Sequence, residues 1–133
     1  MLFLGRYPRS SIDLNIEILQ ADAGTRCTGI NAAALALADA GIPMRDLVVA
    51  VAAGKVDGQV VLDLNKKEDN MGEADLPMAI TSRDKKITLL QMDGHLTQDE
   101  FKQAMDLCLG VVDQVNEIQR EGPDGQILGE VIT

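Results

Sequence analysis

Residues 18–43, ILQADAGTRCTGINAAALALADAGIP, join a polar turn to an alanine-rich helix. The turn covers residues 20–25, and a helix is predicted over residues 27–40, because Gly41 and Pro43 follow in the order typical of a helix C-terminus. Most side chains of this helix are Ala or Leu. A helix with such a small-residue surface is expected to pack closely against a sheet.

Strands are predicted on both sides of this helix. Residues 11–18, SIDLNIEI, alternate apolar and polar side chains with a period of two, which places every Ile and Leu on one face of a half-buried strand. A glycine-bounded turn at residues 54–58 predicts a β-hairpin, and a polar loop is expected at residues 65–75. Four strands are expected around this turn and after this loop, at residues 47–53, 59–64, 76–81 and 87–92.

A second helix is predicted over residues 98–120. It begins at a capping box, in which the Thr97 hydroxyl and the Glu100 carboxylate each accept a hydrogen bond from a backbone N–H group. Its apolar residues recur every three or four positions and form one buried stripe. The order strand, helix, four strands, helix favours an α+β sheet with helices packed on one face. A short irregular tail is expected at residues 122–133.

The composition indicates one globular domain, because 133 residues, 46% apolar and 25% charged, suffice for a single hydrophobic core. No apolar run reaches the roughly 18 to 20 residues of a membrane span, and the N-terminus does not resemble a signal peptide, so a cytoplasmic location without membrane contact is expected. Cys27 and Cys108 are expected to be buried thiols. The net charge of −9 argues against this chain gripping a nucleic-acid backbone by itself, since that affinity comes from Lys and Arg.

The first candidate site is the turn that leads into the alanine-rich helix. Free N–H groups and the positive end of the helix dipole point into this turn, Gly24 allows close backbone approach, Thr25 offers a hydroxyl, and Arg26 can bind an anion with two N–H groups. These features predict a phosphate cradle. The alternative interpretation is that Thr25 only caps the helix and that Arg26 pairs with Asp22.

The second candidate site is an acidic loop. Carboxylates held near one another raise each other's proton affinity, so that one can act as a general acid while another binds a divalent cation. The alternative is a solvated acidic turn, and spacing alone does not assign the roles. His95, the only histidine, is expected to be an exposed turn residue. The carboxylates of the loop are Asp63, Glu68, Asp69, Glu73 and Asp75.

Several motifs, taken in order, resemble the RNase PH family. The match covers roughly residues 7–120 and is closest to the family's branch of catalytic archaeal exosome subunits. It implies an RNase PH-like fold, also described as ribosomal protein S5 domain 2-like, and it outweighs both alternative interpretations above. The resembling segments are YPRS (7–10), ILQADAGTR (18–26), ALADAGIPMRDL (36–47), GKVDG (54–58), LDLN (62–65) and EDNMGEAD (68–75).

The resemblance implies phosphorolysis, in which inorganic phosphate is the co-substrate, attacks the last phosphodiester at the 3′ end of single-stranded RNA and releases a nucleoside diphosphate. Asp69 would protonate the departing 3′ oxygen. Asp75 would help to place it or, together with Asp69, bind a magnesium ion, although polynucleotide phosphorylase has a lysine where this sequence has Pro77. The residues that would hold the attacking phosphate are Ala23, Gly24, Thr25 and Arg26.

The resemblance also implies that half of the fold is missing. Family members are about twice as long, and their N-terminal half supplies another sheet-and-helix unit with arginines. Residues 1–121 are therefore expected to be the C-terminal half of an RNase PH-type domain, inactive in isolation, whose partner is a homologous subunit in a hexameric ring. The alternatives are a non-catalytic assembly module of such a ring, or an RNase PH that trims the 3′ ends of tRNA.

Overall fold

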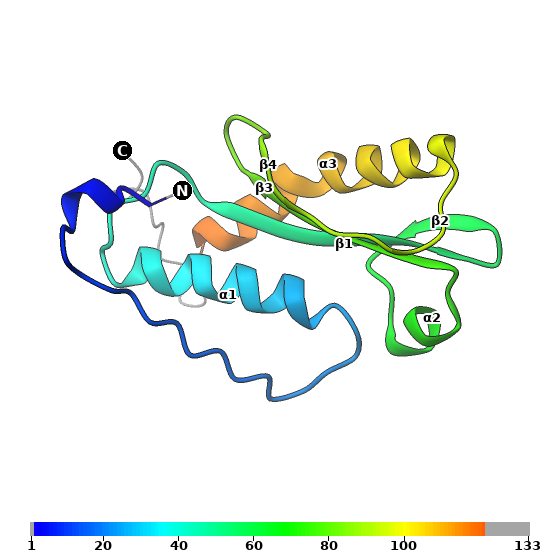
Figure 1. Ribbon diagram of the computed structural model, residues 1–133, viewed down its shortest axis with the longest axis horizontal. Helices are drawn as coiled ribbons and strands as arrows, with labels where there is room; N and C mark the ends of the chain where they lie inside the picture. Colours follow the sequence, from blue (N-terminus) through cyan, green and yellow to red (C-terminus); the bar gives the residue numbers. More distant parts are fainter. Residues whose placement is uncertain (1, 122–133) are drawn as a thin grey trace.

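One antiparallel sheet forms the centre of the molecule in the computed structural model, which describes residues 2–121 (Figure 1). The strand order is β2-β1-β3-β4, and the short strand β5 pairs with β3. The elements confirm the predicted α+β class. The strands span Val48–Val56 (β1), Gln59–Leu62 (β2), Ala74–Thr81 (β3), Ile87–Leu90 (β4) and Asp93–Gly94 (β5). The helices span Thr25–Asp39 (α1), Lys66–Met71 (α2) and Gln98–Glu121 (α3), with a 3-10 turn (η1) at Leu4–Arg6.

The two long helices, α1 and α3, cover opposite faces of the sheet (Figure 1). Val49 and Ala53 of β1 belong to the buried cluster beneath α3, whereas Val48 joins the cluster that contains Cys27 of α1. The prediction that the helices pack on one face is therefore wrong. The reason lies in the sequence VVAVAA at residues 48–53, where successive apolar residues fit a strand that is buried on both sides.

Residues 11–18 are extended but do not form the predicted strand. A strand needs a neighbour to satisfy its backbone N–H and C=O groups, and within residues 2–121 no strand pairs with this segment. The segment runs along α1 instead (Figure 1), where a Cβ added to Gly29 would lie 3.4 Å from Ile16 Cγ2. The alternating side chains stay partly exposed, at 36% for Ile12, 50% for Leu14, 50% for Ile16 and 42% for Ile18.

The β1–β2 hairpin is confirmed, but its turn is shorter than predicted. Only Asp57 and Gly58 form it, with φ angles of 49° and 74°, values typical of two-residue hairpin turns. Gly54 lies inside β1, where an added Cβ would come within 2.3 Å of Leu64 Cδ1 and 2.6 Å of the Ala74 carbonyl oxygen. The glycine at this position therefore serves close packing and not the turn.

Capping boxes begin both downstream helices. The loop expected at residues 65–75 contains α2, whose first turn is capped by Asn65 and Glu68. At the start of α3, the Glu100 N–H donates to Thr97 Oγ1 at 3.3 Å and the Thr97 N–H donates to Glu100 Oε2 at 2.8 Å, as predicted. None of the helices within residues 2–121 is both long and apolar enough to cross a membrane. The tail predicted at residues 122–133 lies outside the described residues.

Candidate active site

Arg26 connects three parts of the fold. From the first turn of α1, its Nη2 donates to Asp75 Oδ2 of β3 at 2.6 Å, and its Nη1 donates to Gln91 Oε1, just after β4, at 3.2 Å. The alternative pairing of Arg26 with Asp22 is wrong, since Asp22 accepts a hydrogen bond from the Lys66 N–H at 3.2 Å. Arg26, the cation of the predicted phosphate cradle, therefore contacts Asp75, a carboxylate of the predicted acidic loop.

Arg26, Asp69 and Asp75 line one hollow of about 270 Å³. The acidic hollow, as we call it, brings together a predicted phosphate ligand and both predicted catalytic carboxylates. Asp69 is exposed on α2, whereas the Asp75 side chain is only 18% exposed. The complete lining is Arg26, Asp69, Gly72, Glu73, Ala74, Asp75, Asp93 and Gly94.

Asp93 is a further carboxylate of this hollow that the sequence pattern did not single out. It lies opposite Asp75 in the β3–β5 pair. The adjacent Gly94 has a φ of 86°, and a Cβ there would lie 2.2 Å from the Glu73 carbonyl oxygen. In the sequence, Asp93-Gly94 indicates only the end of a strand, because the pairing that places Asp93 here is long-range.

Burial is the main cause of a raised pKa at Asp75. The Arg26 guanidinium opposes this effect, while the charges of Asp69 and Asp93 raise the pKa of Asp75 further. Neighbouring carboxylates that favour a bound proton suit general acid catalysis. Asp75 is already paired with Arg26, and the exposed Asp69 is therefore the better placed of the two to reach a substrate.

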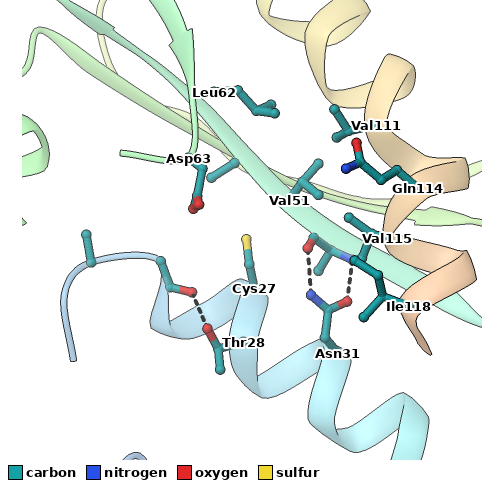
Figure 2. A pocket seen from close by; sticks show the side chains of 14 residues that line it. Cys27, Thr28, Asn31, Val51, Leu62, Asp63, Val111, Gln114, Val115 and Ile118 are labelled. Carbon is teal, nitrogen blue, oxygen red and sulfur yellow. Dashed lines mark hydrogen bonds between the residues drawn. The ribbon is translucent and has the colours of Figure 1, made fainter. Parts of the chain in front are cut away.

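The other predicted phosphate residues do not line the acidic hollow. Gly24, with a φ of 60°, is the N-cap of α1 without a side-chain hydrogen bond, so the alternative assignment of Thr25 as N-cap is wrong. Ala23 and Gly24 line a separate hollow of about 340 Å³ (Figure 2). Thr25 lines a third hollow, which Arg26 also lines. Among the four residues, the structure brings only Arg26 together with Asp69.

The hollow in Figure 2 lies at an edge of β1 that β2 leaves uncovered, because β2 pairs only with residues 53–56 of β1. The Asn31 amide replaces a neighbouring strand there, donating to the Ala50 carbonyl oxygen and accepting from the Ala50 N–H, both at 2.8 Å. Cys27 also lines this hollow, and burial raises the pKa of its thiol to about 11. A thiol with that pKa is not an activated nucleophile.

Two carboxylates of the acidic loop have structural partners. Glu68 completes the capping box of α2. Glu73 Oε2 lies 2.8 Å from Lys55 Nζ, which also lies 3.0 Å from Glu100 Oε1. Lys55 lowers the pKa of Glu73, and Glu73 therefore stays ionised with its charge compensated at the rim of the acidic hollow. The interpretation as a solvated turn does not describe these residues.

The carboxylates do not form a ready metal site. Within the described part of the chain, no three His, Cys, Asp or Glu side chains are grouped so that they could hold a metal ion. Asp75 Oδ2 accepts from Arg26 Nη2 at 2.6 Å, and a cation bound at this oxygen would have to displace the guanidinium. We therefore derive no step from the magnesium ion considered for Asp75 and Asp69.

The two family models that match this chain describe consecutive domains. Residues 46–110 match domain 2 of the 3′ exoribonuclease family, and residues 1–43 match its domain 1. The chain therefore belongs to the 3′ exoribonuclease family, the RNase PH family, as its motifs indicated. The junction between the two matches falls between α1 and β1.

Curated relatives include two archaeal proteins named exosome complex component Rrp41. The one from Thermococcus kodakarensis is 63% identical over 120 residues, and the one from Thermoplasma acidophilum is 56% identical over 120 residues. Each alignment covers 90% of this chain and 48% of the relative, so the chain spans about half the length of these proteins. The crystal structure of rice Rrp46 has a TM-score of 0.71 at 25% identity, covering 77% of this chain and 49% of that one.

Proposed function

We propose that this chain is the carboxylate-bearing part of a phosphorolytic 3′→5′ exoribonuclease subunit in an archaeal exosome-like complex. One observation carries the proposal: Arg26, which lies far in the sequence from Asp69 and Asp75, lines the same hollow as these two carboxylates. The family description, 3′ exoribonuclease, and the name of the similar archaeal proteins, exosome complex component, support this assignment.

The proposed reaction uses phosphate as the nucleophile. A phosphate oxygen attacks the phosphorus of the last phosphodiester, a new P–O bond forms, and the bond to the 3′ oxygen of the preceding nucleotide breaks. Arg26 neutralises the charge of the attacking phosphate in the acidic hollow. The predicted help from free N–H groups at the start of α1 requires a phosphate that also reaches the neighbouring hollows, which Ala23, Gly24 and Thr25 line. Asp69 gives its proton to the departing 3′ oxygen, and the product is a nucleoside diphosphate.

The charge of the acidic hollow indicates that the site needs additional basic residues. Four carboxylates and one guanidinium line it, and the whole chain has a net charge of −9. Phosphate and RNA are both anions and are repelled by such a surface unless cations are added. We therefore propose that a homologous RNase PH-type subunit in a hexameric ring, or further family sequence, supplies basic residues facing the 3′ end of single-stranded RNA.

Incubation with poly(A) and inorganic phosphate tests the proposal. The assay uses the chain alone and the chain mixed with a separately produced N-terminal half of an archaeal relative. We expect the mixture to release ADP and the Asp69→Ala variant to release none. Asp106→Ala, a change of an exposed carboxylate on α3, is the matched control and should keep activity.

The other outcomes separate the remaining functions. An assembled ring that releases no ADP supports the assembly module and contradicts the enzyme. A chain that forms active rings without any partner, and prefers tRNA 3′ ends to poly(A), supports a tRNA-trimming RNase PH.

A further inference from the structure

The backbone fixes Gln91 beside the strand that carries Asp75. Strand β4 ends at Leu90, and the N–H of Gln91 donates to the Pro77 carbonyl oxygen at 3.1 Å. Pro77 lies two positions beyond Asp75 in β3. Asp75 and Gln91 therefore project from adjoining backbone segments, and both reach the same guanidinium of Arg26.

A guanidinium held by one acceptor keeps rotational freedom about that contact. The bond from Arg26 Nη2 to Asp75 Oδ2, at 2.6 Å, is such a single contact. The second bond, from Nη1 to Gln91 Oε1 at 3.2 Å, fixes the orientation of the guanidinium plane because it engages the other terminal nitrogen. These two bonds use two of the five N–H donors of the side chain, and three remain for an anion.

The chemistry of an amide suits this position better than that of a carboxylate. Gln91 supplies an acceptor without a charge, whereas a second carboxylate on Arg26 would give the group a net negative charge, because Asp75 already pairs with the guanidinium. The acidic hollow, which Arg26 also lines, already contains Asp69, Asp75 and Asp93, so further negative charge would oppose an incoming phosphate. The Arg26 side chain is 55% exposed, so a phosphate ion in solvent can reach it.

We infer that Gln91 is a positioning residue for phosphate binding: its amide oxygen, together with Asp75, holds the guanidinium plane of Arg26 and adds no charge to the acidic hollow. The inference rests on the proposed function, because it takes Arg26 as the residue that binds inorganic phosphate. It assigns to Gln91, just after β4, a role in a site otherwise formed by residues from α1, α2, β3 and β5.

Two measurements on the full chain, mixed with the N-terminal half of an archaeal relative that supplies the missing cations, test the inference. Nitrogen NMR of Arg26 gives the rate of exchange between Nη1 and Nη2, which reports rotation of the guanidinium, and a titration with inorganic phosphate gives the affinity. In Gln91→Leu we expect faster rotation and an affinity lowered about fivefold, the effect of losing one ordinary hydrogen bond. In Gln91→Glu we expect rotation to stay slow while phosphate affinity still falls, since the acceptor is kept and a charge is added.

Gln59→Leu, the same change at an exposed position in β2, is the control and should alter neither quantity. Equal rotation rates and equal affinities in wild type and Gln91→Leu overturn the inference, as does a Gln91→Glu variant that binds phosphate as well as wild type. A wild-type chain that binds no phosphate even when completed by the N-terminal half contradicts the proposed function, and the rotation rates then still decide whether Gln91 holds Arg26.

Discussion

The two faces of the sheet differ in how completely this chain covers them. Beneath α3, Ala104, Cys108 and Val112 are fully buried against β1 and β3. On the opposite face, α1 is rich in Ala and Leu on nearly all sides, a pattern typical of a helix with neighbours all around it. Among residues 2–121, the segment at residues 11–18 runs along its outer side (Figure 1), and the Ile and Leu side chains of this segment stay partly exposed. The α3 face is therefore complete, and the α1 face, which carries Arg26, is open.

The largest effect is expected on the complete face. Leu76 is fully buried in the cluster beneath α3, so Leu76→Ala should lower the free energy of unfolding by about 3 kcal/mol, through lost burial and a cavity. Urea denaturation followed by circular dichroism measures this change. Leu14→Ala, at a position 50% exposed on the open face, should change stability by less than about 0.5 kcal/mol. Similar losses for the two variants would show that the faces do not differ.

The next largest effect is expected on the affinity for phosphate at the open face. Arg26→Ala removes the cation of the acidic hollow and should weaken phosphate binding by about 10- to 100-fold, the range for hydrogen bonds to charged groups. Stability should change by less than about 1 kcal/mol, since the pair with Asp75 is partly exposed. Titration calorimetry with inorganic phosphate, on the chain completed by the N-terminal half of an archaeal relative, measures the binding. Unchanged affinity would show that Arg26 does not bind phosphate. Arg83→Ala, at an exposed position outside the acidic hollow, is the control and should keep the affinity of wild type.

A smaller effect is expected at the start of α3. Thr97→Ala removes the hydroxyl that accepts from the Glu100 N–H and should lower the free energy of unfolding by about 1 kcal/mol. Thr97→Ser keeps the hydroxyl and should behave like wild type in the same thermal denaturation experiment. A destabilisation shared by both variants would indicate a packing role for the threonine methyl group and not a cap.

Local patterns predicted what depends on local interactions. The capping box and apolar stripe of α3, the Ala-rich helix and the hairpin followed from spacing along the chain, because each is formed by residues near one another. The places of Gln91 and Asp93 depend on long-range pairing of β3 with β4 and β5. The short helix α2 has a local signal, the capping box of Asn65 and Glu68, which the sequence prediction missed. Arg26 and Asp75 could be suspected separately, but only the fold shows that they meet.

The segment at residues 11–18 illustrates the same limit. Its alternation correctly marks one apolar face, but a strand also requires a neighbour, which the described residues do not supply. Exposed apolar surface of this kind favours association.

The smallest change in folding stability is expected in this segment. Replacing Ile12, Leu14 and Ile18 by Ser should leave the free energy of unfolding within about 0.5 kcal/mol of wild type, because these side chains are at least one-third exposed. Sedimentation velocity should show the wild-type chain self-associating, or bound to a partner, and the triple variant shifted toward monomer. A wild-type chain that is a stable monomer would contradict the view that the α1 face is open.

The central claim is that Arg26 and Asp69 serve attack by phosphate, and labelled orthophosphate tests it most directly. The chain, completed by the N-terminal half of an archaeal relative, is incubated with poly(A) and phosphate carrying a radioactive phosphorus atom. The account predicts ADP with the label in its β-phosphate, and no labelled ADP from the Asp69→Ala variant. Release of unlabelled AMP would mean that water is the nucleophile and would contradict the account.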